Sequence, residues 1–191
     1  MSRTTYHHGD LRNALEQAAL ELVAERGPHG FSLAEASRRA GVSVAAPFRH
    51  FANKDALLAA LALRSYTEQH DRFAAAIADA DDPVEQLARF AAAYVEFAIE
   101  EPALFDVTFS AGLNKPEHPG LEEAGARVLA VLRSPAEQLR SDPAAALALI
   151  HSVAATAHGF AAFLREGVVP DLRTATTEAA EAARRLAGQG T

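Results

Sequence analysis

Apolar residues recur along this chain at intervals of three and four positions, and no segment shows the apolar–polar alternation that is typical of a half-buried strand. Alanine supplies much of the apolar content, and β-branched residues are sparse outside short runs such as Val168-Val169. Because alanine has the highest intrinsic helix propensity, composition and spacing favour the same structure. The sequence therefore predicts an all-α protein of about nine helices.

Two helices are expected close to the N-terminus. The apolar spacing predicts a first helix over about residues 10–26, which stops at Gly27. Ser32 and Glu35 form a capping box, in which each side chain satisfies a backbone amide of the other residue. This box opens a second helix, and Gly41 ends it, since glycine accepts a left-handed backbone at a helix end.

A third, short helix is expected directly afterwards. Ser43 caps it, so only a three-residue turn separates it from the second helix, which is the spacing of a helix-turn-helix. Apolar Phe48 and Phe51 are expected to seat it against the core. Pro47 lies within it and lacks an amide hydrogen, so we expect the helix to begin tightly or irregularly, with Ala46 disfavoured from helical geometry.

The remaining helices are expected to begin at Asn53, Asp82, Pro102, Leu121, Asp142 and Asp171. The helix from Asn53 continues to about Ala80. The helix from Leu121 runs to about Gln138, and we expect Pro135 to kink it or cut it short. With 191 residues, 49% of them apolar, the chain has enough material for a small domain and a larger one. We therefore predict two domains, residues 1–58 and 59–191.

Charge is distributed unevenly along the chain. The net charge is −7, but residues 1–60 carry seven Lys or Arg and six Asp or Glu residues, a net of +1. Binding to phosphates requires a local basic face rather than a basic protein, so a nucleic-acid partner remains compatible with this composition.

The short third helix offers exposed positions for a DNA groove. Small side chains at its start permit close approach to base edges, and the basic residues at its end and beyond are placed to meet phosphates. A helical hairpin that binds nothing is the alternative interpretation. The candidate DNA-binding residues are Ser32, Arg39, Ser43, Val44, Ala45, Ala46, Phe48, Arg49, His50 and Lys54.

Three segments in this region resemble one known family. AALELVAERG, FSLAEASRRAGVS and FRHFANKDALL occur in the order found in the DNA-binding domain of TetR-family bacterial transcriptional repressors. The resemblance implies that Lys54 contacts a phosphate, and that Phe48 stands where the family usually has a tyrosine near the DNA backbone. The resemblance therefore implies that this protein lacks one hydrogen bond to a phosphate that the tyrosine hydroxyl makes in the family.

The N-terminal stretch Tyr6-His7-His8-Gly9-Asp10 has three interpretations. Its histidines and aspartate are possible metal ligands, but adjacent residues rarely converge on one ion without other ligands. An arm that lies along DNA and a disordered tail are the other two. With no cysteine in the chain, no thiolate site exists, and we predict no metal and no cofactor.

Aromatic residues gather in the predicted fifth and sixth helices, which makes this region the best candidate for an effector pocket, although each aromatic is as easily a core residue. His151 and His158 lie seven positions apart on one helix face and either contact a ligand or are buried polar residues satisfied by neighbours. The candidate ligand-binding residues are Phe90, Tyr94, Phe97, Phe105, Phe109, His151 and His158.

Small residues around the two histidines permit another helix to approach closely. Together with the ninth helix, they favour a dimer interface that includes Ala155, Gly159 and Ala162. His158-Gly159 and the segment EPALFDVTFS also resemble a TetR subgroup whose regulatory domain has a histidine–glycine pair preceded by tryptophan, although Ala154 stands at the tryptophan position. This resemblance implies a regulatory domain with an effector pocket.

The leading prediction is a ligand-responsive repressor that binds a near-palindromic operator in double-stranded DNA as a homodimer and is released by a small-molecule effector of unknown identity. The alternative is a helical small-molecule-binding or interaction protein without specific DNA readout. An enzyme ranks third, because the sequence has no phosphate loop and no nucleophile–base–acid set. No stretch of eighteen apolar residues lacks a charge or histidine, so we expect a cytoplasmic protein without a membrane partner.

Overall fold

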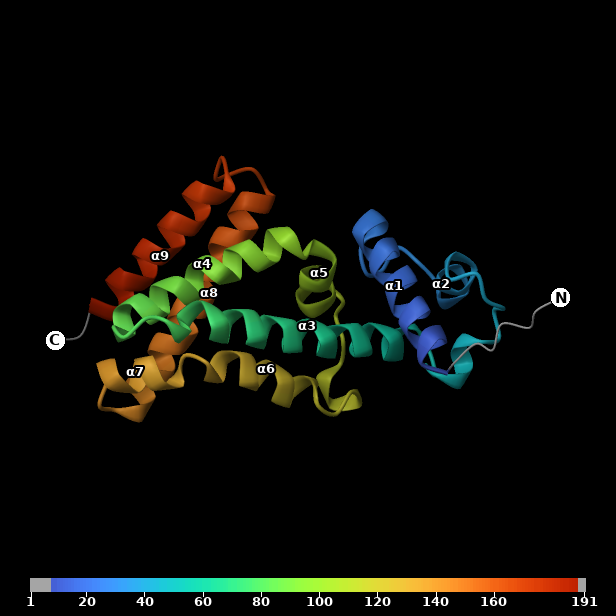
Figure 1. Cartoon of the computed structure of the whole chain (residues 1–191), viewed down its shortest axis with the longest axis horizontal. Coiled ribbons are helices and arrows are strands. Elements are labelled where there is room, and N and C mark those ends of the chain that lie inside the picture. The colour runs from blue at the N-terminus through green and yellow to red at the C-terminus, as the bar shows by residue number, and fades with distance from the viewer. Residues whose placement is uncertain (1–7, 189–191) are drawn as a thin grey trace. The chain divides into compact units, whose positions relative to one another are not determined.

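The computed structural model describes residues 8–188 and shows an all-helical protein (Figure 1). Within this range there are nine α-helices, two short 3-10 helices and no strand. The elements are α1 (His8–Arg26), α2 (Leu33–Arg39), η1 (Pro47–Arg49), α3 (Lys54–Ala78), α4 (Pro83–Glu100), α5 (Pro102–Ser110), η2 (Lys115–Glu117), α6 (Leu121–Ala130), α7 (Arg133–Leu139), α8 (Pro143–Arg165) and α9 (Leu172–Gly188). The predicted fold class and the count of nine are confirmed.

The chain divides into two compact units. One contains the residues up to Ser65 together with 102–122, and the other contains 66–101 and 123–191, so α3 contributes to both. In the first unit α1 packs against α2 and α5. The domain boundary at residue 58 stays a prediction, because a division by contacts does not test which segments fold independently.

Predicted helix ends in the first unit are confirmed in detail. The Glu35 amide donates to the Ser32 hydroxyl at 3.3 Å, and the Ser32 amide donates to the Glu35 carboxylate at 2.8 Å, which completes the capping box of α2. Gly41 follows this helix with a φ of +70°, a left-handed backbone that disfavours other residues. Asn53 caps α3 by accepting the Ala56 amide at 2.8 Å.

The segment between these caps, residues 43–51, differs from the predicted third helix; we call it the recognition segment. Ser43 caps no α-helix there, and a turn leads instead into the 3-10 helix η1. The Ala46 amide donates to the Ser43 carbonyl at 3.0 Å and the Arg49 amide to the Ala46 carbonyl at 3.3 Å, three residues back in each case.

Proline explains this difference. An α-helical register would need an amide hydrogen at residue 47 to bond with the Ser43 carbonyl, and Pro47 has none. The expected tight or irregular start is therefore confirmed. Ala46 nevertheless has helical angles, with φ −63° and ψ −41°, so the expectation that proline disfavours this geometry was wrong.

Pro135 likewise divides the predicted seventh helix. The structure has α6 up to Ala130 and a separate α7 from Arg133, so Pro135 is the third residue of a new helix. The first four amides of a helix have no partner within it, so proline is tolerated at this position. Two helices in place of one, and a 3-10 helix in place of an α-helix, leave the number of α-helices unchanged.

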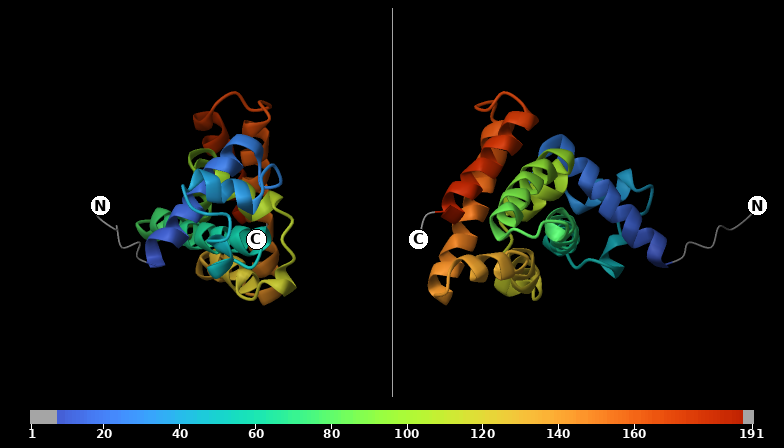
Figure 2. Two further views of the ribbon diagram at one scale, coloured as in Figure 1. Left: turned by 90° about the vertical axis from the view of Figure 1, so that its right-hand side faces the viewer. Right: turned by 60° about the vertical axis from the view of Figure 1, so that its left-hand side comes forward.

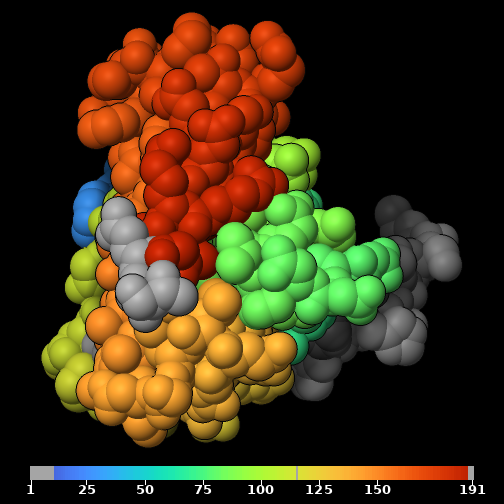
Figure 3. Space-filling view, turned by 90° about the vertical axis from the view of Figure 1, so that its left-hand side faces the viewer, coloured from blue at the N-terminus to red at the C-terminus, as the bar shows by residue number. Residues whose placement is uncertain are grey.

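The second unit is built around Phe73 and the bundle of α4, α8 and α9 (Figure 2). Phe73 is fully buried, and its ring centroid lies 5.0 Å from that of Phe90 and 6.1 Å from that of Phe97. Along α9, one face of alanines is 0–3% exposed, namely Ala175, Ala179, Ala183 and Ala187. The small side chains let α9 pack close to α4 and α8. Figure 3 shows α9, in red, at the surface of this unit.

Candidate functional site

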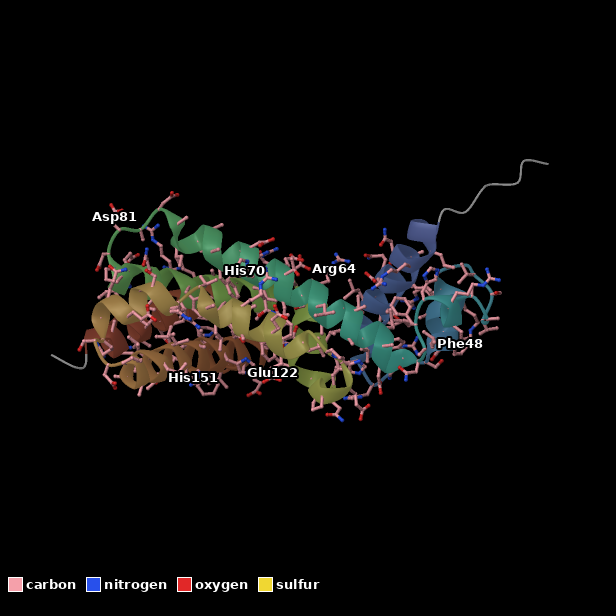
Figure 4. All side chains as sticks on the ribbon, turned by 90° about the horizontal axis from the view of Figure 1, so that it is seen from below. Phe48, Arg64, His70, Asp81, Glu122 and His151 are labelled. Carbon is pink, nitrogen blue, oxygen red and sulfur yellow. The ribbon has the colours of Figure 1, made fainter. Side chains whose placement is uncertain are left out.

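The recognition segment presents apolar side chains outward. Val44 is 52% exposed and Phe48 is 64% exposed, whereas Pro47 and Phe51 are buried. The sequence analysis expected Phe48 to seat the segment against the core, and this was wrong. Pro47 takes the inward position beside Phe51 instead. Figure 4 labels Phe48 at the surface of this unit.

The other predicted groove residues share this outward face to different degrees. Ser43, Ala45 and Arg49 are exposed, while Ala46 and His50 are half-buried. The short side chains of Ser43, Ala45 and Ala46 leave the backbone there accessible. The segment thus has one exposed side, and its other side is anchored in the core by Pro47 and Phe51.

Three exposed arginines in this unit have no carboxylate partner among the described residues: Arg38, Arg49 and, on α3, Arg64. Arg39, by contrast, donates to Glu25 at 2.9 Å and lies 3.8 Å from Glu21. The sequence analysis named Arg39 and missed Arg38. The signal was available, because consecutive helical residues point about 100° apart and the glutamates on one helix face neutralise only one of them.

Two of the predicted DNA-binding residues form hydrogen bonds within the protein itself. Lys54 is half-buried; its ammonium donates to the Phe31 carbonyl at 3.1 Å and lies 4.9 Å from the Phe31 ring centroid. The Ser32 hydroxyl belongs to the capping box and donates to Glu35 at 2.9 Å. The hydrogen bonds from the Ser32 hydroxyl and amide, with a smaller contribution from Arg26, lower the pKa of Glu35 to about 2.

The predicted effector residues do not form one site. Phe90 and Phe97 are fully buried around Phe73, so they contribute to the core. Phe105 and Phe109 belong to α5 in the other compact unit, where their ring centroids lie 4.8 Å apart and Phe109 is 44% exposed.

Tyr94 and His158 are brought together. The Tyr94 hydroxyl and Nδ1 of His158 form a hydrogen bond of 2.9 Å, and the Tyr94 ring stacks on Phe73 at 5.6 Å. Burial raises the pKa of Tyr94. Burial, with a smaller effect of the Arg165 charge, lowers the pKa of His158. The pair therefore remains uncharged at neutral pH and offers polar atoms in an apolar setting.

His151 lies in a different environment from His158. Figure 4 labels His151, which is exposed. It borders a concavity of about 410 Å³ between α6, α7 and α8, together with Arg133 and Ile150. Seven-residue spacing put both histidines near one helix face, but the neighbouring helices give them different surroundings.

A further concavity, of about 350 Å³, lies between α3 and α6 and was not predicted from the sequence. His70 and Arg127 border it and also border a smaller hollow beside Tyr66. Arg127 is exposed and has no carboxylate partner in the part of the chain that the structure describes. These residues lie on different helices, and no local sequence pattern relates them.

One side of α8 is apolar and exposed. Counting at helical spacing, this α8 stripe contains Ala144, Leu147, Ala148, His151, Ala155, Gly159 and Ala162. Leu147 is 53% exposed, and Phe163 beside the stripe is 49% exposed. The three predicted dimer residues all lie on it. The alanine face of α9, which the sequence suggested for the same interface, is already buried within the chain.

By length and composition, α8 is also apolar enough to cross a membrane, with a mean hydropathy of 1.6 over its most apolar stretch. Only 28% of that stretch is buried within the chain. Among residues 8–188, no group of three or more histidines and carboxylates is placed to hold a metal ion. In the stretch from Tyr6 to Asp10, Tyr6 and His7 lie outside the described residues, and the backbone of His8–Asp10 begins α1.

Comparison with known proteins places both parts of the chain. Residues 16–61 match the family model described as bacterial regulatory proteins, tetR family. Residues 87–187, more than half of the chain, match the model described as tetracyclin repressor-like, C-terminal domain.

Individual relatives agree with these matches. The chain is 31% identical over 98 residues to YobS of Bacillus subtilis strain 168, described as an uncharacterized HTH-type transcriptional regulator, and the match spans 51% of each protein, about half the length of that relative. A Rhodococcus sp. RHA1 protein of unknown function has a similar structure, with a TM-score of 0.79, 27% identity and coverage of 96% of this chain and 98% of its own.

The fatty acid degradation regulator FadR of Bacillus halodurans has the same fold, with a TM-score of 0.74 at 16% identity, covering 99% of this chain and 98% of its own. The helix-turn-helix geometry, the helical second unit and the two family matches lead to one conclusion: this chain belongs to the TetR family of bacterial regulatory proteins.

Proposed function

We propose that the protein is a cytoplasmic repressor that binds a near-palindromic DNA operator as a homodimer and releases it when a small molecule binds. The observation that carries this proposal is the recognition segment, which presents an exposed apolar surface flanked by two arginines without carboxylate partners among the described residues. Exposed arginines of this kind attract phosphates, and such phosphate contacts fix the register and orientation of a protein on a duplex.

The α8 stripe supports the homodimer. No Lys, Arg, Asp or Glu occurs between Pro143 and Leu164, so His151 is the one titratable side chain on the exposed stripe. Apolar patches of this kind mark an interface with another protein or a membrane. We assign the stripe to a second copy of the chain, because a self-complementary patch of small residues suits the two-fold symmetry that a palindromic operator requires.

The effector is proposed to bind in the second unit. The concavity beside His151 supplies space for the effector, and the pair of Tyr94 and His158, which does not line that concavity, supplies polar atoms elsewhere in the same unit. An effector acts only through its different affinities for the DNA-bound and the released state, so binding at this unit must change its structure. A displacement of the Phe73 cluster or of α8 would meet this requirement.

Selection of bound sequences from random duplex DNA, with purified full-length protein, tests the proposal. A two-fold symmetric motif, bound with an affinity that falls steeply with salt, is the expected result. The Arg38→Ala and Arg49→Ala double variant is the control and should recover no motif. If the wild-type protein also recovers none at low salt, the alternative applies, a helical ligand-binding protein without DNA readout.

A further inference from the structure

We propose that the recognition segment reads each half-site mainly through the 5-methyl groups of thymines, with Val44 and Phe48 as the specificity-determining residues. This inference rests on the proposed DNA binding and adds the chemical basis of sequence choice. Among the four bases only thymine carries a methyl group in the major groove, and apolar side chains recognise it by contact.

The chemistry of the segment supports this mode of readout. Base discrimination by hydrogen bonds generally uses Arg, Lys, Asn or Gln side chains that meet base edges in pairs of bonds. From Ser43 to Phe48 no such side chain occurs, and only the serine hydroxyl can hydrogen-bond. Arg49 follows at the end of η1. Any base sequence that residues 44–48 read must therefore be read through apolar contact or DNA shape.

Exposure identifies the two residues that can make this contact. Val44 is 52% exposed and Phe48 is 64% exposed, although both are large apolar side chains and the core lies directly beneath them. Pro47 takes the buried position between them in sequence, and Phe51 closes the segment at 3% exposure. The backbone bonds of η1 thus hold one apolar surface inward and a second one outward.

The surrounding charge indicates that nucleic acid, rather than an apolar protein surface, covers these side chains. Arg38 and Arg49 lie on either side of Val44 in the sequence, are exposed, and have no carboxylate partner in the described part of the chain. Ala45 and Ala46 add no bulk, so the backbone can approach a groove closely. An apolar centre with unneutralised guanidinium groups around it matches thymine methyl groups between two phosphate backbones.

The test uses the operator recovered by selection and replaces each thymine in turn by deoxyuridine, which removes the methyl group and keeps the base pair. We expect at least one thymine in each half-site at which this replacement weakens binding roughly fourfold, as burial of one methyl group requires. Thymines outside the contacted positions should show no change.

Two variants assign the methyl groups to residues. Val44→Ala should reduce the deoxyuridine effect at one thymine to less than about twofold, and Phe48→Ala should do so at a second thymine or at the same one. Val168→Ala is the matched control: Val168 is 64% exposed in the other compact unit, and its variant should keep the wild-type pattern. Unchanged melting temperatures would show that all three variants keep the fold.

Each outcome separates the inference from the proposed function. A palindromic operator that tolerates deoxyuridine at every thymine overturns methyl readout and leaves the repressor standing. A deoxyuridine effect that persists in both the Val44 and Phe48 variants also overturns it, since the methyl groups then act on DNA shape or on another residue. Absence of any preferred duplex contradicts the proposed function itself.

Discussion

The recognition segment and the α8 stripe both expose apolar side chains, but they differ in length and in the charge around them. The recognition segment is nine residues long, contains Arg49 and follows Arg38 by five positions, whereas α8 runs for 23 residues with no charged side chain until Arg165. The difference shows that exposed apolar area alone does not identify a partner. Neighbouring charge indicates polyanionic DNA for the first surface, and its absence favours another copy of the chain for the second.

The largest effect is expected where the recognition segment meets the core. Phe51 is 3% exposed, so Phe51→Ala should lower the free energy of unfolding by about 3–5 kcal/mol. Phe48 is 64% exposed, and Phe48→Ala should change it by less than about 0.5 kcal/mol. Urea unfolding of the two variants measures this. Similar losses in both would mean that Phe48 is not presented outward.

The next prediction breaks the α8 stripe. Ala155 is exposed, so Ala155→Arg should leave the single chain folded and place a charge in the proposed interface. Sedimentation should show monomers, and affinity for the full palindrome should fall at least about a hundredfold because two linked half-sites no longer act together. Val168→Arg, on an exposed residue outside the stripe, should remain dimeric. A dimeric Ala155→Arg protein would place the interface elsewhere.

Salt dependence distinguishes the arginines around the recognition segment. Arg49→Ala should reduce the slope of log affinity against log salt concentration by about 0.9 for each lost phosphate contact, on every duplex tested. Arg39→Ala should change the slope less, because Arg39 is already paired with Glu25. Equal changes in both variants would mean that the ion pair with Glu25 opens on DNA.

A smaller effect is expected at the inner edge of α8. Tyr94→Phe keeps the ring against Phe73 and removes the hydrogen bond to His158, at a cost of about 1 kcal/mol in unfolding free energy.

Because the pKa of His158 is lowered in the folded chain, the unfolded chain binds the proton first as pH falls. Stability should therefore fall as pH drops below the ordinary histidine value of about 6.5. His158→Gln should flatten that part of the melting-temperature profile.

The smallest effect concerns the capping box before the recognition segment. The pKa of Glu35 is lowered to about 2, so its contribution to stability is complete above the ordinary glutamate value and is lost as pH falls from there toward 2. Glu35→Gln should remove this portion of the acid sensitivity, as measured by thermal melts across that range. If the melting temperatures of the wild type and the Glu35→Gln variant change in parallel with pH, the capping box does not respond to pH.

Local signals predicted most of the helices, because the groups that determine a helix end are close in sequence. Ser32 with Glu35, Asn53 with Ala56, and the aspartates before α4, α8 and α9 all form the expected caps. The recognition segment was the main exception among the described residues. There, one proline removed the amide that an α-helix needs, and whether a tight turn or a kinked helix resulted depended on packing of Pro47 in the core.

The candidate site was less predictable, since its geometry joins distant residues. Tyr94 and His158 were named for their chemistry, but only the packing of α4 on α8 brings them to hydrogen-bonding distance. Phe90 and Phe97 of α4 are buried around Phe73, a residue of α3 whose local sequence gives no sign of that role. His70 and Arg127 border a shared concavity only because α3 and α6 lie together.

Sequence alone therefore determined the helical class and most of the helix ends, because propensity and capping act over a few residues. Tertiary structure decided that Pro47 faces inward and Phe48 outward, that α9 buries its alanines within the chain, and that α8 leaves its stripe exposed. Which side of an apolar helix is buried depends on the helices that pack against it from elsewhere in the chain. The local sequence of that helix does not specify which helices these are.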